Sequence, residues 1–359
     1  MEAASRSETI RAKINRYKEF WDRKNSTALL GFSVGSYFPS ERYAAARRFL
    51  KTKQKIEAEM INVQEFIPDY LKMFDQWNRI DHDIFFTAAP FTGIPWLEAM
   101  LGCDVFSTES SFVAHTINRD IDRIDLGSIR LPDWSEKYIE FICTLQDTGE
   151  GIFPVGQPIL RGPADIVGTF LGHEELVLAL FDHPEVVVKL LNQSAQRFLD
   201  LICDQQKYLR PFWDGYAMGF YDLWCPGPCL WFQDDLTALL SPKFYEKYIY
   251  EIHRTLSANA PYTMMHLHPS SFYILDYLLD IETLKAIQIN KDIGGPTVEE
   301  MMPWLQKVQA KKNLVLCGDF SPQEFAYLTN SIQPEGLYIL VWNEDVSVQA
   351  AEYRVSDGK

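Results

Sequence analysis

The chain has 359 residues, with 34 lysines and arginines against 49 aspartates and glutamates, which gives a formal net charge of −15. This charge opposes binding to nucleic acids and to anionic membrane surfaces, so we expect a small molecule or another protein as the partner. Hydrophobic residues make up 47% of the chain, yet no stretch reaches the roughly 18 to 20 consecutive apolar residues that span a bilayer. The charged start differs from a signal peptide and the six cysteines are scattered, so we expect a cytoplasmic protein with reduced thiols.

The first part of the sequence predicts an irregular, largely helical extension, which we assign to residues 1–80. A helix is expected over residues 4–24, a strand over 27–35, and further helices over about 41–54 and 62–77. The tight turn FTGIPW and the apolar run GIFPVGQPIL follow, separated and flanked by long helical patterns.

The second part, from Ser241 onward, alternates strands and helices with short connections. Ser241 and Pro242 are a typical N-cap and first helical residue. The strands are expected in YTMMHLH, LKAIQIN, NLVLCGD and GLYILVW, with helices between them. This order predicts parallel strands and, at this length, an α/β fold of the (β/α)₈ TIM-barrel type over residues 81–359; an open doubly wound sheet is the alternative. No glycine-rich phosphate loop is present, so no nucleotide cofactor is expected.

Polar side chains follow the predicted strands, where the active site of a barrel lies. His266 and His268 are two residues apart on one strand, so both imidazoles face the same side. They could hold a metal such as zinc, with Cys317 or Glu344 as the third ligand. Alternatively they bind substrate or transfer protons without a metal, or they are structural.

Other candidates come from the remaining strand ends. Arg161 could clamp a carboxylate with its planar guanidinium group. Asp234 and Asp292 are candidate acids or bases, and Asp235 is a candidate substrate contact. The two tryptophans Trp96 and Trp224 are expected to line an apolar substrate pocket.

Several ordered motifs between residues 80 and 345 resemble the uroporphyrinogen decarboxylase superfamily. They are FTGIPWLEAMLGCDV, the segment from GQPILRGPADIVG to KLLNQ, LSPKFYEKYI, the histidine strand and LVLCGDFSP. The resemblance implies a (β/α)₈ barrel with one of two chemistries. These are cofactor-free decarboxylation of porphyrinogens and zinc-dependent methyl transfer from a methylated corrinoid to a thiol or related acceptor.

The motifs of the true decarboxylases are missing at three places. GFSVGSYFPSERY lacks the arginine-rich loop, FTAAPF lacks the aspartate before FTGIPW, and VWNED lacks the late histidine. The methyltransferase branch has HxC where this chain has His266-Leu-His268, and its late cysteine falls near Trp342 to Glu344. The resemblance therefore favours a methyltransferase-like enzyme acting on a small molecule, with zinc and a corrinoid protein as partner. A metal-free decarboxylase or lyase and a non-catalytic ligand-binding homologue are the alternatives. Either a short helix in AAEYRV closes the last barrel unit, or a partner chain in a homodimer covers its exposed edge.

Overall fold

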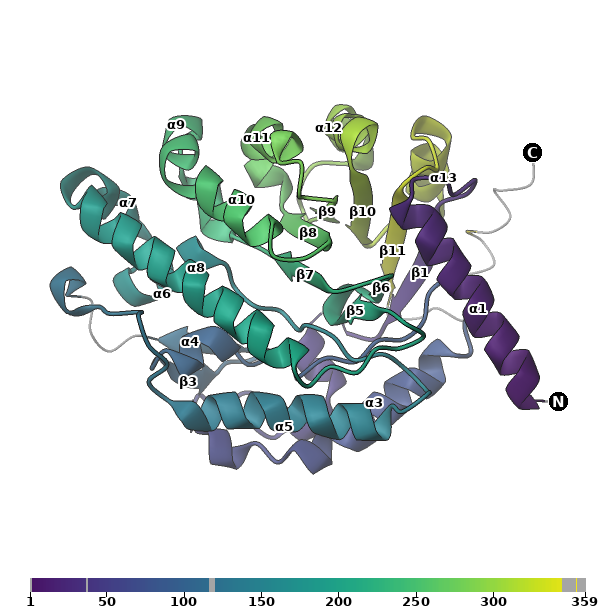
Figure 1. The fold of residues 1–359 in the computed structure, drawn as a ribbon, viewed down its shortest axis with the longest axis horizontal. Helices are drawn as coiled ribbons and strands as arrows, with labels where there is room; N and C mark the ends of the chain where they lie inside the picture. The colour runs from purple at the N-terminus through teal and green to yellow at the C-terminus, as the bar shows by residue number, and fades with distance from the viewer. Residues whose placement is uncertain (1, 37, 116–119, 344–352, 354–359) are drawn as a thin grey trace.

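Six parallel strands form the main sheet of the computed structural model, which describes residues 2–36, 38–115, 120–343 and 353 (Figure 1). In spatial order these strands are β1 (Leu29–Val34), β11 (Leu337–Asn343), β10 (Asn313–Gly318), β9 (Ala286–Lys291), β8 (Tyr262–Leu267) and β7 (Cys229–Phe232). Each neighbouring pair is parallel. The carboxyl ends of these strands therefore meet at one edge of the sheet, and the polar residues that follow them lie close together.

Helices follow the strands of the second half in the predicted order. They are α9 (Pro242–Phe244) and α10 (Tyr250–Ser257), then α11 (Leu275–Asp280), α12 (Val298–Lys311) and α13 (Pro322–Ser331). The predicted N-cap is confirmed, because the Ser241 side chain accepts a hydrogen bond from the backbone N–H of Phe244. A π-helical turn at Tyr245–Ile249 joins α9 to α10. The alternation of strand and helix predicted from Ser241 onward is confirmed.

The first half is mostly helical. Its long helices are α1 (Glu2–Trp21), α3 (Val63–Trp77), α5 (Pro132–Thr148) and α8 (Pro184–Gln206). Shorter helices are α2 (Ala44–Arg47), α4 (Trp96–Met100), α6 (Pro163–Leu171) and α7 (His173–Asp182). A small antiparallel sheet contains β2 (Lys55–Ile56), β3 (Asp104–Ser107) and β4 (Phe112–His115). The helix predicted over 41–54 is wrong beyond Arg47, where the chain turns into β2.

Two extended segments, around Ala88 and Val155, lie outside the six-stranded sheet. They pair with each other through a single parallel bridge. Pro154 and Pro158 lack the backbone N–H that a longer ladder would need. The segment after Val155 is attached to β7 by the Gln157 side chain, which donates to the Trp231 carbonyl (2.6 Å) and accepts from the Trp231 N–H (3.1 Å).

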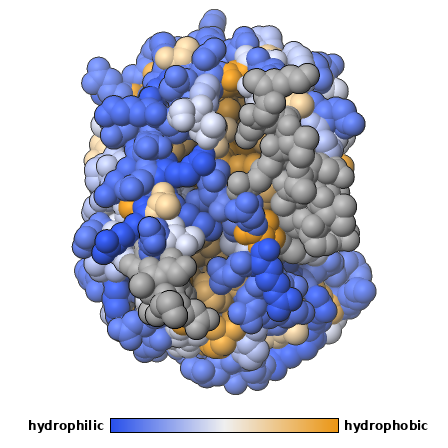
Figure 2. Space-filling view, turned by 90° about the vertical axis from the view of Figure 1, so that its right-hand side faces the viewer, coloured by the Kyte–Doolittle hydropathy of each residue, from blue (hydrophilic) through white to orange (hydrophobic). Residues whose placement is uncertain are grey.

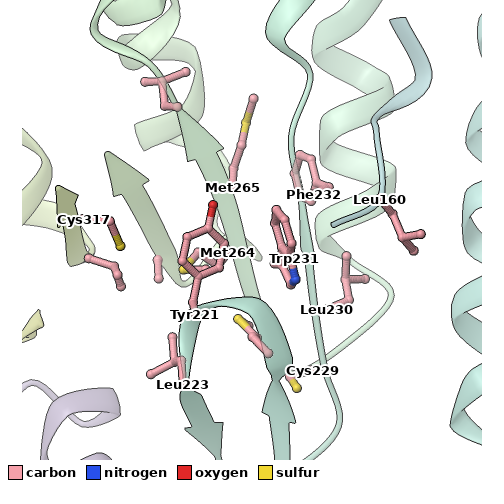
Figure 3. Close-up of a cluster of buried hydrophobic side chains, with 14 of the residues drawn as sticks. Leu160, Tyr221, Leu223, Cys229, Leu230, Trp231, Phe232, Met264, Met265 and Cys317 are labelled. Atoms are coloured by element: carbon pink, nitrogen blue, oxygen red, sulfur yellow. The ribbon is translucent and has the colours of Figure 1, made fainter. Parts of the chain in front are cut away.

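A short antiparallel hairpin of β5 (Tyr216–Met218) and β6 (Leu223–Cys225) packs against the main sheet, and Tyr221 lies at its tip. Figure 3 shows the tip beside Met264, Trp231 and Cys317, in the apolar cluster under β8. The hairpin is tied to other elements by hydrogen bonds from Tyr338 Oη to the Tyr221 carbonyl (2.9 Å) and from Tyr17 Oη to the Asp222 carbonyl (2.6 Å).

The face drawn in Figure 2 is mainly hydrophilic, with hydrophobic residues gathered in a band near its middle. This distribution agrees with the acidic composition of the chain. Among the described residues, no helix is both long enough and apolar enough to cross a membrane.

Candidate metal site

A pocket of about 590 Å³ opens at the carboxyl ends of the parallel strands. Its walls include polar groups from the ends of β7, β8 and β9, from α4, from α6 and the segment before it, and from the start of α7. These groups are Glu98, Arg161, Asp165, His173, Gln233, Asp235, His266, His268 and Asn290. Phe220 and Tyr221 from the hairpin tip also line the pocket. The sheet topology thus brings groups that are far apart in sequence into one cavity.

His266, on β8, is held as a neutral imidazole with a defined tautomer. Its Nδ1 faces Oε1 of Gln288 and lies 3.0 Å from Tyr221 Oη. The Gln288 amide is oriented because its Nε2 donates to Asn290 Oδ1 (2.9 Å). Nδ1 of His266 therefore carries the proton, and Nε2 presents its lone pair. Burial lowers the pKa of His266, although the charge of Asp235 acts in the opposite direction. The lowered pKa favours the neutral form of the ring.

His268 follows β8 and is oriented by a carboxylate. Its Nδ1 lies 2.7 and 2.9 Å from the two oxygens of Asp292, so the Nδ1–H donates to that carboxylate. Burial opposes protonation, but the hydrogen bond to Asp292 and the charge of Asp235 outweigh it and raise the pKa of His268. The ring is perpendicular to that of His266, with centroids 4.6 Å apart.

Asp235 completes the cluster from the loop after β7. Its Oδ1 lies 3.8 Å from Nε2 of His266 and 4.0 Å from Nε2 of His268. The other oxygen accepts a hydrogen bond from Gln233 Nε2 (3.1 Å). One ligand atom from each of the three residues lies within 4.8 Å of the others. Ligand atoms around tetrahedral zinc are about 3.3 to 3.5 Å apart, so small side-chain movements would close the cluster on an ion.

The donor set is suited to a divalent transition metal. Two neutral imidazole nitrogens and one carboxylate oxygen are ligands that zinc accepts in sites with an open coordination position. The same combination is also used by non-haem iron. The Nδ1 atoms of both histidines are hydrogen-bonded, and both Nε2 atoms face Asp235. Histidines that bind a metal are usually oriented in this way, by a hydrogen bond from the ring nitrogen that does not bind the metal. Asp235, His266 and His268 therefore form a possible metal-binding triad.

Asp165 at the start of α6 fixes the backbone that carries Asp235. Its carboxylate accepts from the N–H groups of Asp235 (3.1 Å) and Leu236 (2.7 Å). In return, the N–H of Asp165 donates to Oδ1 of Asp234 (3.0 Å). This reciprocal pair joins the start of α6 to the loop after β7, so Asp235 projects from a rigid support.

The structure places Asp234 behind the pocket rather than in it. The side chain is buried, and its Oδ2 lies 3.0 Å from Nε2 of His253, whose Nδ1 is 2.9 Å from Tyr245 Oη. Burial raises the pKa of Asp234 to about 8 and lowers that of His253 to about 3, so both are held in their neutral forms. With both oxygens engaged, Asp234 has a supporting position, which corrects the predicted acid/base role.

The predicted third ligands are not in the triad. Cys317 is buried on β10 beside Gln288, and burial raises the pKa of its thiol well above the ordinary value. Its sulfur is absent from the ligand group formed by the described residues. Glu344 lies outside the residues that the structure describes. Asp235, predicted as a substrate contact, occupies the position of a third ligand instead.

Arg161, predicted to clamp a substrate carboxylate, lines the pocket, and its Nε lies 3.4 Å from Oε1 of the buried Glu98. The two tryptophans do not line it. Trp96 is fully buried against α5 and donates to the Phe91 carbonyl. Trp224 is buried in the hairpin and donates to the Phe212 carbonyl. Both rings pack in the hydrophobic core and are absent from the lining of the pocket, which corrects the prediction that they bind substrate.

Three supporting residues were not predicted. Gln288 carries a sequence signal, because Gln288 and Asn290 alternate on an otherwise apolar strand and so face the same side. Asp165 has a weak signal as an acidic residue in the first turn of a helix. Tyr221 has none, because its position depends on the hairpin.

No protein-family model matches the sequence, and no curated protein matches it. Among solved structures, a methyltransferase from Methanosarcina mazei is similar with a TM-score of 0.63 and 8% sequence identity, over 95% of this chain and 95% of that one. The YdhT protein from Bacillus subtilis is similar with a TM-score of 0.41 and 14% identity, over 97% of this chain and 89% of that one. The first likeness shows a shared fold.

Proposed function

We propose that this protein is a zinc-dependent, methyltransferase-like enzyme of the uroporphyrinogen decarboxylase superfamily. The observation that carries the proposal is the convergence of Asp235, His266 and His268 in a large pocket. In the proposed architecture, the segments around Ala88 and Val155 complete a (β/α)₈ barrel between β1 and β7, which puts the triad at the barrel mouth. The shared fold with a methyltransferase agrees with this assignment.

The residues of the triad would each have a defined task. Nε2 of His266, Nε2 of His268 and Oδ1 of Asp235 would hold the ion, which would acidify a thiol or water at its open position. Gln288 and Asp292 accept from the Nδ1–H groups and so orient both rings with Nε2 as the nitrogen that would bind the ion. Asp165 keeps Asp235 in place through the backbone.

Arg161, held by Glu98 in the lining of the same pocket, would orient the acceptor molecule. Arg161 is 39% exposed, so its guanidinium group can reach a substrate anion, while Glu98 is 1% exposed and restricts its movement. We propose a small acceptor with an anionic group and a methyl donor carried by a corrinoid protein. The surrounding acidic residues Asp165 and Asp235 make a polyanionic porphyrinogen a poor fit for this pocket.

The first test is metal content, measured by plasma mass spectrometry on protein purified without chelators. Wild type should contain close to one zinc per chain, and Asp235→Asn and His268→Ala should lose it. Asp280→Asn, which alters an exposed carboxylate paired with Lys311, is the matched control and should keep the metal. Wild type should also transfer methyl groups from methylcobalamin to a small thiol, and the two ligand variants should not.

Other outcomes would redirect the assignment. Stoichiometric iron would indicate an iron site with the same donor set. A folded wild-type protein without metal would overturn the zinc mechanism. Turnover without metal would then favour a lyase in which His266, beside Tyr221 Oη, serves as an acid or base. Ligand binding without turnover would identify a non-catalytic homologue.

A further inference from the structure

A second large pocket lies away from the metal site, between the loop after β1, the α2 helix with its following loop, and α3. Its volume is about 500 Å³. The charged residues along it are four cations, Arg42, Arg47, Lys51 and Lys72, and two carboxylates, Glu41 and Glu109. It shares no lining residue with the pocket of the triad.

Positive charge at this pocket contrasts with the acidic chain around it. From Arg42 to Ile56 the sequence contains no aspartate or glutamate. It contains six cations there, Arg42, Arg47, Arg48, Lys51, Lys53 and Lys55. In a chain with a formal net charge of −15, such a local excess marks a surface for an anion.

The four cations of the pocket outnumber its two carboxylates, Glu41 and Glu109. Within the described part of the chain, none of them forms an ion pair, whereas the nearby Arg48 pairs with Glu65. Arg47 Nε donates to the backbone carbonyl of Glu41 (2.8 Å), and the Glu41 carboxylate accepts from Ser36 Oγ (2.7 Å). The pocket therefore gathers like charges whose repulsion a bound anion would relieve.

Arg42 is fixed by neutral groups at the inner end of the pocket. Its Nε donates to the Ser36 carbonyl (2.7 Å) and its Nη1 to Ser33 Oγ (2.9 Å). Burial lowers the pKa of Arg42, although the charge of Asp222 acts in the opposite direction, which reflects the cost of holding a partly desolvated cation. A guanidinium group held in this way is prepared to bind an oxyanion with little loss of side-chain entropy.

The loop that carries Lys51 has an unusual backbone. Lys51 and Lys53 have φ angles of 68° and 53°, which lie in the left-handed region of backbone conformation. Residues other than glycine seldom adopt this region. The N–H of Lys51 donates to the Thr108 carbonyl (2.8 Å), which holds the loop against the segment before β4. Strained backbone of this kind is concentrated at ligand-binding sites.

We propose that this pocket binds a small oxyanion with two or more negative charges, through Arg42, Arg47, Lys51 and Lys72. Phosphoryl and carboxylate groups both present a pair of oxygens that the planar guanidinium group of arginine can bind through two parallel hydrogen bonds. The volume accommodates a small organic molecule that carries such groups. The site is independent of the metal triad and of the reaction proposed for it.

The test is isothermal titration of the full-length protein with pyrophosphate and, separately, with succinate, at low and at high salt. Tight binding of pyrophosphate alone identifies a phosphoryl ligand, and tight binding of succinate alone identifies a carboxylate ligand. Arg47→Glu and Lys72→Glu should each weaken binding by about tenfold or more, as the loss of a charge-assisted contact does. Arg47→Lys should retain most of the affinity, because it keeps the positive charge.

The matched controls are Lys189→Glu and Lys243→Glu, which make the same charge change at exposed positions outside the pocket. They should leave the affinity unchanged. Arg47 and Lys72 are themselves exposed, so the pocket variants should melt at the wild-type temperature. No binding of either anion to wild type, or equal losses in pocket and control variants, would overturn the proposal. Metal content should be the same in all these proteins, which separates this test from that of the triad.

Discussion

The two histidines show how neighbouring residues of one type acquire different properties. His266 lies on β8 and His268 directly follows that strand, but Nδ1 of His266 meets the neutral amide of Gln288 and Nδ1 of His268 meets the carboxylate of Asp292. The pKa of His266 is accordingly lowered, chiefly by burial, while that of His268 is raised. An imidazole that donates to a carboxylate is the more basic ligand of the two.

Asp292 is therefore expected to tune the metal affinity without touching the ion. Asp292→Ala removes the acceptor for Nδ1–H of His268, and zinc affinity should fall about 10- to 100-fold. Asp292→Asn should cost less, because the amide oxygen can still accept. The affinities can be measured by competition with a chromophoric chelator. Asp276→Ala, at an exposed carboxylate, is the control, and equal affinity of Asp292→Ala and wild type would contradict the orienting role.

At this scale the sequence predicted part of the site. The i, i+2 spacing placed both histidines on one face of a strand, and the order of the strand ends brought Asp292, Asp235 and Arg161 into consideration. It could not separate Asp234 from Asp235, because adjacent residues in a loop can point in opposite directions. Only the contact of Asp234 with His253, 19 residues later, shows which of the two faces the core.

At the scale of elements, the hairpin of β5 and β6 determines the shape of the core beneath the triad. Its backbone lies so close to the segment around Val155 that Gly156 has no room for a side chain. A Cβ at Gly156 would lie 1.9 Å from the Ala217 carbonyl oxygen and 2.8 Å from the Gly219 nitrogen, and backbone atoms cannot rotate away. The hairpin and this segment therefore depend on each other for their placement.

Gly156→Ala should destabilise the protein by about 1 to 3 kcal/mol or more, as overpacking in a core does. The unfolding free energy can be measured by urea denaturation. Gly227→Ala is the control, since the nearest atoms to a Cβ there belong to the Tyr262 ring and to Pro261, at ordinary contact distances of 3.4 Å and 3.8 Å. Its stability should stay near that of wild type. If the two variants were equally stable, the hairpin would not be packed as closely as the structure has it.

The elements were predicted to different extents for a physical reason. The strands β8 to β11 and their helices have regular periodicity, capping residues and short connections, all of which are local signals. The hairpin and the segments around Ala88 and Val155 are held by hydrogen bonds of Gln157, Tyr338 and Thr87 to residues that are far away in the sequence. Such contacts leave no periodic pattern in the sequence, so the run GIFPVGQPIL was apolar enough for a strand but gave only one bridge.

At the scale of the whole molecule, Asp222 links three parts of the fold. Its carboxylate accepts from Thr87 N–H (2.8 Å) and Oγ1 (2.9 Å), and its carbonyl accepts from Tyr17 Oη in α1 (2.6 Å). Burial raises the pKa of Asp222 to about 7, although the bonds from Thr87 and the charge of Arg42 act in the opposite direction. The folded protein thus holds a proton that the unfolded chain releases at its ordinary pKa of 3.8.

This difference predicts how the stability of the whole protein depends on pH. The stabilisation that comes from protonated Asp222 is fully present below its pKa of 3.8 in the unfolded chain and is lost as pH rises through its folded pKa of about 7. Between these two pKa values the unfolded state binds fewer protons than the folded state, so stability falls as pH rises. Each unit of pKa difference is worth about 1.4 kcal/mol, so the loss should amount to a few kcal/mol. Asp222→Asn keeps the acceptor oxygen for Thr87 but cannot titrate.

Urea denaturation of wild type and Asp222→Asn across the range from about pH 4 to about pH 8 checks this expectation. The difference in unfolding free energy between the two proteins isolates Asp222 from the many other carboxylates. As pH rises to about 7, the unfolding free energy of Asp222→Asn should increase relative to that of wild type. Above that pH the difference should remain constant, because Asp222 is fully ionised above its folded pKa. Parallel profiles over the whole range would mean that Asp222 is ionised in the folded protein throughout, with Arg42 compensating its buried charge.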